Sequence, residues 1–216
     1  MKPYEIVSLG VNCLPRTILT RWGIKPKKAD GELSCPFDLV AHSPETILKC
    51  LQTNFEGYFD DLFFKLRKRN ILDFRGKGLW QKKDGTVFFH DKDCKKNDKE
   101  KLVNRIKNRI DNFNNIINTD KPILFVMALY KETDSRDKIY ETLKKLRGNK
   151  PFKFLVLAFD TTIKTNNNEI EKLEIPKPIK TYDTDWNRSR FIKSELGVYV
   201  EKLICYNVEK ILDKMT

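Results

Sequence analysis

The sequence predicts an α/β fold: a three-layer sandwich with a mainly parallel central sheet flanked by helices, plus a β-hairpin. Two apolar runs of strand length, 122–128 and 152–159, enclose a helical pattern at 139–146. This order is typical of parallel strands joined by a right-handed crossover. Asp84-Gly85, between two strand-like segments, is a strong hairpin signal. The chain of 216 residues is long enough for one sizeable core, so we expect a single α/β domain over 1–216.

The first two expected elements are a strand and a short helix. Residues 5–9 are apolar and β-branched, Gly10 permits a sharp turn, and Pro15 suits the first turn of a helix. Apolar residues then recur at helical spacing until Gly23. A second helix is expected from Ser43, because serine followed by proline is a typical helix start.

The remaining elements follow in the same way. Residues 99–118 carry the apolar stripe of a long helix, and 165–169 are expected to form an exposed polar loop. We expect a short strand at 179–182 and a terminal helix over 188–215 that contains Gly197. In the hairpin, His90 is expected at the end of the second strand.

Composition restricts the classes of partner and cofactor. The net charge of +12 is not accompanied by a nucleic-acid-binding motif, so nucleic acid is not favoured as a partner. No apolar run is long enough to span a bilayer, and the first residues do not resemble a signal peptide, so we expect a cytoplasmic protein. The five scattered cysteines have neither disulfide-scaffold nor zinc-site spacing, and we expect no metal and no cofactor. The sequence carries no signal for the oligomeric state.

Cys13 is the leading candidate for chemistry because it lies between the first strand and the first helix. The positive end of a helix dipole favours anions, so the pKa of a thiol at this point is expected to be lowered. Free cysteines are also often buried as small hydrophobic residues, and this alternative stays open. Ligands of parallel sheets bind at the carboxyl ends of the strands. We therefore expect Cys13, Tyr130, Lys131 and Asp160 to converge on one rim.

Only two histidines are available as a base for Cys13. His90 is the candidate, with a surface or capping role as its alternative, whereas His42 precedes the second helix. Asp91 would point to the opposite face if the strand continued through it. Asp38, Asp160 and Asp185 are alternatives for orienting the His90 ring.

Four motifs together resemble a known family. They are Ser8-Leu9-Gly10-Val11-Asn12-Cys13, Cys35-Pro36-Phe37-Asp38, Asn54-Phe55-Glu56-Gly57-Tyr58-Phe59 and Phe88-Phe89-His90-Asp91. In order and approximate spacing they are similar to a bacterial and viral family described as papain-like cysteine peptidases. The resemblance covers roughly the first 130 residues and includes the helix at 105–110 and the strand at 123–126. Leu39 stands where that family usually has Trp.

The resemblance implies roles for these residues. Cys13 would be the nucleophile, His90 its partner, and Asp38 a third member of the catalytic set. The substrate would contact the motifs and the rim, at Ser8, Gly10, Asn12, Phe37, Asp91 and Asp160. A papain-like domain packs its cysteine helix against an antiparallel sheet, whereas 122–159 predicts a parallel one. We take the fold from the strand pattern and the site from the motifs, since similar catalytic pairs recur on unrelated folds.

Three functional hypotheses follow. The first is a thiol hydrolase or acyl transferase acting on a peptide, isopeptide or amide, with an oxyanion held by N–H groups near residues 10–14. The second is an esterase-like hydrolase with Ser8 as nucleophile, although no histidine follows His90 in the sequence. The third is a non-catalytic module that binds an anion or sugar phosphate at the first strand-to-helix turn. A single glycine in that turn is a weak phosphate signature.

Overall fold

We describe the protein from a computed structural model, which covers residues 3–66, 78–91, 93–159, 161–175 and 195–215. The elements are, in chain order, β1 (Glu5–Ser8), α1 (Leu14–Arg21), the 3₁₀ turn η1 (Lys28–Asp30), α2 (Pro44–Thr53), β2 (Leu62–Lys65), β3 (Leu79–Lys82), α3 (Lys99–Asn118), β4 (Ile123–Leu129), α4 (Ser135–Arg147), β5 (Phe152–Phe159), β6 (Ile170–Ile175) and α6 (Glu195–Asp213).

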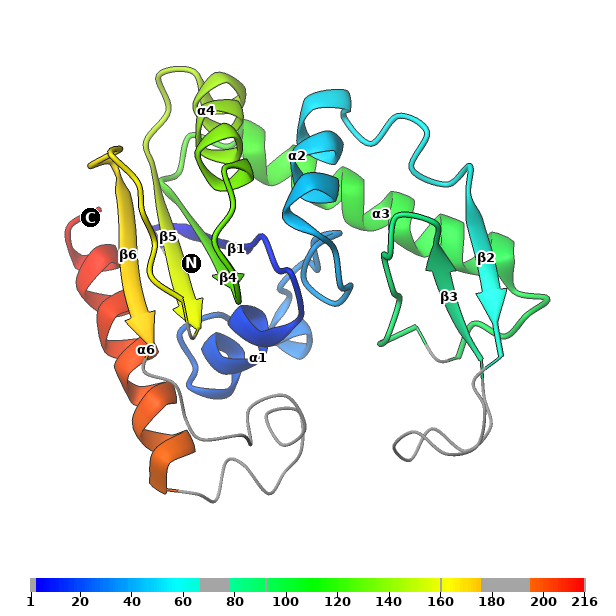
Figure 1. Cartoon of the computed structure of the whole chain (residues 1–216), viewed down its shortest axis with the longest axis horizontal. Coiled ribbons are helices and arrows are strands. Elements are labelled where there is room, and N and C mark those ends of the chain that lie inside the picture. The colour runs from blue at the N-terminus through cyan, green and yellow to red at the C-terminus, as the bar shows by residue number, and fades with distance from the viewer. Residues whose placement is uncertain (1–2, 67–77, 92, 160, 176–194, 216) are drawn as a thin grey trace.

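Four parallel strands form the central sheet, in the order β1-β4-β5-β6. Val7 pairs with Phe125, and Phe125 with Phe154, so the strands end together at one carboxyl edge. In Figure 1 the arrowheads of β4, β5 and β6 point to this edge, beside α1. The predicted β4–α4–β5 unit is confirmed. The sheet that packs against α1 is therefore parallel, unlike the antiparallel sheet of a papain-like domain.

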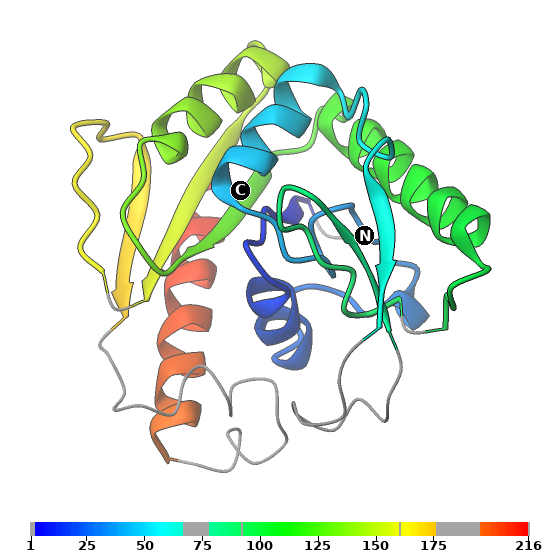
Figure 2. The ribbon, with the colours of Figure 1, turned by 45° about the vertical axis from the view of Figure 1, so that its right-hand side comes forward.

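Helices cover both faces of this sheet, which confirms the expected three layers (Figure 2). One apolar core joins Val7 of β1 to α2, α3 and α4, and the other joins Ile6 to α1 and α6. Neighbouring strand residues point to opposite faces, so each strand contributes to both cores. All seven residues of β4 are buried. This explains why β4 is continuously apolar in the sequence rather than alternating.

The antiparallel pair lies beside the main sheet and is formed by β2 and β3. Gly85 has a φ of +89°, and the chain reverses at Asp84-Gly85 as predicted. After the turn, however, Val87 makes only isolated bridges to Gln81 and Ala41. The expectation that His90 ends a strand is therefore wrong, because His90 lies in an exposed turn.

The structure also differs from the predictions after β5. Residues 165–169 are followed by strand β6, which the sequence pattern did not indicate. It carries three charged residues, Glu171, Lys172 and Glu174, and pairs only with β5 among the described strands. The strand expected at 179–182 lies outside the described residues. The terminal helix is described from Glu195 and contains Gly197, as expected.

A buried arginine joins the loops at the amino edge of the sheet. Arg147, at the end of α4, is 2% exposed and donates hydrogen bonds to four main-chain carbonyls, those of Ile117, Thr119, Lys121 and Pro151. These carbonyls belong to the ends of α3 and the starts of β4 and β5. Arg147 therefore holds the amino ends of both central strands relative to α3. None of the described helices is long and apolar enough to cross a membrane.

Candidate functional site

Cys13 is the residue that immediately precedes α1, in the turn that follows β1. The turn is tight: a Cβ added to Gly10 would lie 1.9 Å from the Asn12 carbonyl oxygen and 3.1 Å from that of Phe37. Gly10 is therefore required for close backbone approach rather than for a left-handed conformation. The Cys13 carbonyl accepts hydrogen bonds from the N–H and the hydroxyl of Thr17, at 3.0 and 2.8 Å. These contacts hold Cys13 against the first turn of the helix.

The electrostatic setting of the Cys13 thiol differs from the one expected. Cys13 is 8% exposed, and this burial raises the pKa of its thiol. A hydrogen bond with Thr17, a backbone contact and the charge of Arg16 act in the opposite direction but are outweighed. The lowered pKa predicted from the helix start is thus wrong, because the loss of hydration disfavours the thiolate more than these contacts favour it.

Residues from three strand ends meet next to Cys13. The Asn12 Nδ2 group donates a hydrogen bond to the Tyr130 Oη atom, over 2.7 Å. Tyr130, directly after β4, stacks on Phe159 at the end of β5, with a centroid distance of 5.3 Å and an interplanar angle of 20°. Of the residues expected at one rim, Tyr130 is joined to the turn of Cys13 through Asn12. Asp160 lies outside the described residues.

The start of α1 offers fewer anion donors than expected. The Leu14 N–H donates to Asn12 Oδ1, over 3.0 Å, and Pro15 has no N–H. The Arg16 guanidinium is directed to Glu32 and Asp38, at 2.8 and 3.3 Å. These contacts do not favour an anion-binding module at this turn. They also remove Leu14 from the donors available to an oxyanion.

Asp38 belongs to a buried group of charges behind α1. It is 0% exposed, its Oδ2 atom accepts from the Cys35 N–H over 2.7 Å, and it pairs with Arg16. Glu32 joins the same group by bridging Arg16 and Lys25. Burial raises the pKa of Asp38, although the charges of Lys25 and Arg16 lower it. Asp38 thus contacts the cysteine helix through Arg16, three residues after Cys13.

The two histidines occupy opposite environments. His42 is 3% exposed, contacts Tyr58 Oη through Nε2 at 2.7 Å, and packs edge-on against Phe37. Burial lowers the pKa of His42 to about 3, so its ring is neutral. His90 lies in an exposed turn, where an imidazole meets water and solutes.

The segment 40–42 connects the turn of Cys13 with the turn of His90. The His42 N–H donates to the Val11 carbonyl over 3.3 Å. The neighbouring Ala41 pairs with Val87 through two hydrogen bonds of 3.0 Å. Val11 is two residues before Cys13, and Val87 is three residues before His90. The fold therefore places these two motifs on either side of one shared segment.

Asp91 has a different environment from the one its motif implied. It is 2% exposed and forms a two-pronged ion pair with Arg109 of α3, at 2.9 and 3.1 Å. Arg105 of the same helix donates to it as well, over 3.0 Å. A carboxylate enclosed by two guanidinium groups has little capacity left for a substrate. Asp91 therefore fixes the 88–91 segment to α3, and this arrangement does not favour it as a substrate contact.

Ser8 and Phe37 are also enclosed. Ser8 is 1% exposed, in β1, and its hydroxyl has no hydrogen-bond partner among the described residues. Such a position does not favour Ser8 as an esterase nucleophile. Phe37 is 0% exposed and packs on Phe55 and Phe113, with ring centroids 5.4 and 5.7 Å away. Its side chain belongs to the core, whereas its carbonyl supports the turn at Gly10.

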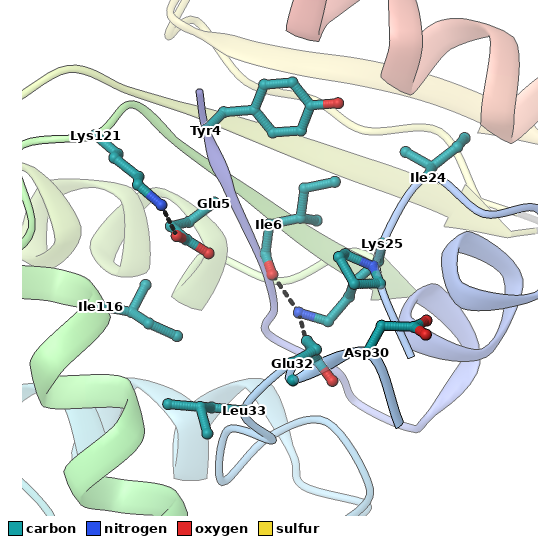
Figure 3. Close-up of a pocket in the computed structure, with 12 residues that line it drawn as sticks. Tyr4, Glu5, Ile6, Ile24, Lys25, Asp30, Glu32, Leu33, Ile116 and Lys121 are labelled. Atoms are coloured by element: carbon teal, nitrogen blue, oxygen red, sulfur yellow. Dashed lines mark hydrogen bonds and ion pairs between the residues drawn. The ribbon is translucent and has the colours of Figure 1, made fainter. Parts of the chain in front are cut away.

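A cavity of about 350 Å³ lies at the other end of β1. Figure 3 shows its walls, which include Tyr4, Ile6 and Ile116 and the ion pairs Lys25–Glu32 and Glu5–Lys121, at 2.7 and 2.8 Å. Cys13 does not line it. Among the described residues, no group of three or more His, Cys, Asp or Glu side chains is arranged to hold a metal ion.

The fold and the turn define an α/β protein with a cysteine at the carboxyl edge of a parallel sheet, directly before a helix. The chain belongs to a family, DUF1796, described as "putative papain-like cysteine peptidase", whose sequence model matches residues 4–167. The match extends from β1 to beyond β5 and includes the motifs of Cys13, Asp38 and His90. Neither the curated proteins nor the solved structures contain a match to the chain.

Sequence reasoning did not find two residues that the structure places around Cys13. Thr17 and Arg16 follow it by four and three positions, so a helix beginning at Leu14 brings them near. The spacing itself was visible in the sequence. The partners of Arg16 were not, because Glu32 and Asp38 belong to a loop without periodicity.

Proposed function

We propose that this protein is a thiol hydrolase or acyl transferase in which Cys13 attacks the carbonyl carbon of a peptide or amide and His90 acts as the base. The observation that carries the proposal is the position of Cys13, directly before α1 at the carboxyl edge of the sheet. Ligand sites of parallel sheets lie at this edge. Membership of a family described as cysteine peptidases supports the same chemistry.

The protonation state of Cys13 decides how the reaction begins. Because burial raises the pKa of the thiol, the proton must leave as Sγ attacks. His90 takes this proton while the S–C bond forms and the carbonyl oxygen becomes an oxyanion. When the C–N bond breaks, His90 returns the proton to the leaving amine, which leaves a thioester on Cys13. Water then releases the acid in a hydrolase, whereas a second amine or alcohol takes the acyl group in a transferase.

Asp38 has a positioning role in this proposal. Its carboxylate holds Arg16, and Arg16 lies one turn after Cys13 on α1. It therefore fixes the helix that carries the nucleophile and does not orient the His90 ring.

Alkylation of the folded protein tests the nucleophile. Iodoacetamide modification of all five cysteines is followed by peptide mass spectrometry at pH 7.5. Cys205 is the matched control, since it is 6% exposed against 8% for Cys13 and burial raises its pKa to about 12. We expect Cys13 to react at least about tenfold faster than Cys205, because a neighbouring base activates a thiol. His90→Gln should remove most of this advantage, whereas His42→Gln should preserve it in protein that circular dichroism shows to be folded.

Turnover provides the second measurement. Hydrolysis of p-nitrophenyl acetate should be lost in Cys13→Ala and retained in Cys205→Ala. Equal alkylation of Cys13 and Cys205, together with unchanged hydrolysis in Cys13→Ala, would refute the proposal.

A further inference from the structure

Tyr130 is an exposed aromatic ring at the same edge as Cys13. It follows β4 directly, and 39% of its surface is exposed. One face of the ring stacks on Phe159, which is itself only 3% exposed. The Tyr130 ring therefore extends the apolar core to the surface at the carboxyl edge. Apolar surface of this kind binds an apolar group favourably, because the contact removes the surface from water.

The ring is held in place from two sides. Phe159 supports its face, and Asn12 donates to its phenol oxygen over 2.7 Å. The Asn12 amide is itself oriented, because its Oδ1 atom accepts the Leu14 N–H. A ring that is already fixed loses little conformational freedom when a ligand packs on it. Asn12 directly precedes Cys13 in the chain, so the ring is anchored to the turn that carries the thiol.

We propose that Tyr130 is the specificity-determining residue of the reaction assigned to Cys13, and that it receives a large apolar side chain, aromatic or branched aliphatic, next to the bond that Cys13 attacks. This inference rests on the proposed function and names its substrate class: peptides or amides with a bulky apolar residue on the acyl side. Small or charged residues at that position gain no contact with the ring. One apolar contact of this size discriminates by about 10- to 200-fold.

Two peptidyl chloromethyl ketones that differ only in the residue next to the reactive carbon test this assignment. One carries Phe and the other Gly, and the rate at which each modifies Cys13 is measured by mass spectrometry. In the unmodified protein, the Phe compound should label Cys13 at least about tenfold faster than the Gly compound. Tyr130→Ala should reduce this ratio to about one, with the change confined to the Phe compound, as expected when an apolar contact is removed.

Two further variants separate the ring from its surroundings. Tyr130→Phe removes the hydrogen bond to Asn12 but keeps the ring, so the preference for Phe should persist. Tyr206→Ala removes another exposed tyrosine, 64% exposed on α6, and should leave both rates unchanged. Thermal unfolding of each variant verifies that the labelled protein is folded.

The outcomes distinguish this inference from the proposed function. If Cys13 is labelled readily but equally by both compounds, or if Tyr130→Ala retains the preference, the role of Tyr130 is overturned while the nucleophile stands. If neither compound labels Cys13 faster than Cys205, the proposed function fails and the inference fails with it.

Discussion

The side-chain amide of Asn12 donates a hydrogen bond to the phenol oxygen of Tyr130, over 2.7 Å, although 118 positions separate the two residues in the chain. Asn12 Oδ1 also accepts the Leu14 N–H, in the turn that leads into α1. The contact joins the turn after β1 to the turn after β4. It thus links the residue next to Cys13 with the aromatic ring at the sheet edge.

We expect Asn12 and Tyr130 to be energetically coupled. Asn12→Ala removes two hydrogen bonds, the one to Tyr130 and the one from the Leu14 N–H, and should lower the free energy of unfolding by about 1–2 kcal/mol. Tyr130→Phe removes only the hydrogen bond. In a double-mutant cycle measured by urea unfolding, the coupling should be about 0.5–1 kcal/mol. Strictly additive effects would show that the contact contributes nothing to stability.

Asp91 should be essential for stability, whereas its neighbour Asp93 should not. Asp91→Asn leaves the buried Arg109 guanidinium without its charged partner, and should lower the free energy of unfolding by about 3 kcal/mol or more. Asp93 binds the same Arg105, but its side chain is 54% exposed. Asp93→Asn should therefore change the free energy of unfolding by no more than about 0.5 kcal/mol. Denaturant unfolding of both variants measures the difference. Equal losses of stability in the two variants would mean that burial does not strengthen the ion pair of Asp91.

Arg147 should also be sensitive to substitution. Arg147→Met removes a donor from four carbonyls, of which that of Pro151 keeps the Ile123 N–H, and each buried group left unsatisfied costs about 1–3 kcal/mol. We expect the free energy of unfolding to fall by about 3 kcal/mol or more. Lys145→Ala, at an exposed position of the same helix, should change it by less than about 0.5 kcal/mol. A loss below about 1 kcal/mol in Arg147→Met would contradict this expectation and indicate that water satisfies the carbonyls once the guanidinium is removed.

Acidification should destabilise the protein through His42. Burial lowers its pKa to about 3 in the folded state, against 6.5 ordinarily. Between these values the unfolded chain binds a proton that the folded protein does not, so the free energy of unfolding falls as the pH falls through 6.5. From pH 7.5 to 5.0, the contribution of His42 should decrease by about 2 kcal/mol.

The variant His42→Gln isolates this contribution. It cannot take up the proton, so its free energy of unfolding should vary less between pH 7.5 and 5.0 than that of the unmodified protein. Asp38, whose pKa is raised by burial, changes stability in the opposite direction, but it does so in both proteins and cancels in the comparison. If the two proteins lose the same free energy on acidification, His42 is not the group responsible.

The elements with a clear period were predictable. The helix over 99–118 and the strand at 152–159 were found with the bounds that the structure gives them, because their apolar residues repeat at helical spacing or form one continuous run. Strand β6 was missed because half of its residues are Lys or Glu and they break the apolar pattern, whereas pairing with β5 stabilises it. His90 was misplaced for a related reason: Asp84-Gly85 specifies the turn, but not how far the strand pairing continues after it.

The sequence by itself determined the parallel α/β architecture, the position of Cys13 before a helix and the family to which the chain belongs. Tertiary structure decided the environment of each candidate: a Cys13 thiol whose pKa is raised by burial, an Asp38 joined to Arg16, an Asp91 enclosed by Arg105 and Arg109, and a Tyr130 ring beside Asn12. The physical reason is the distance along the chain over which each interaction acts. Secondary structure follows from residues a few positions apart, whereas hydration and ion pairing depend on side chains brought together from distant segments.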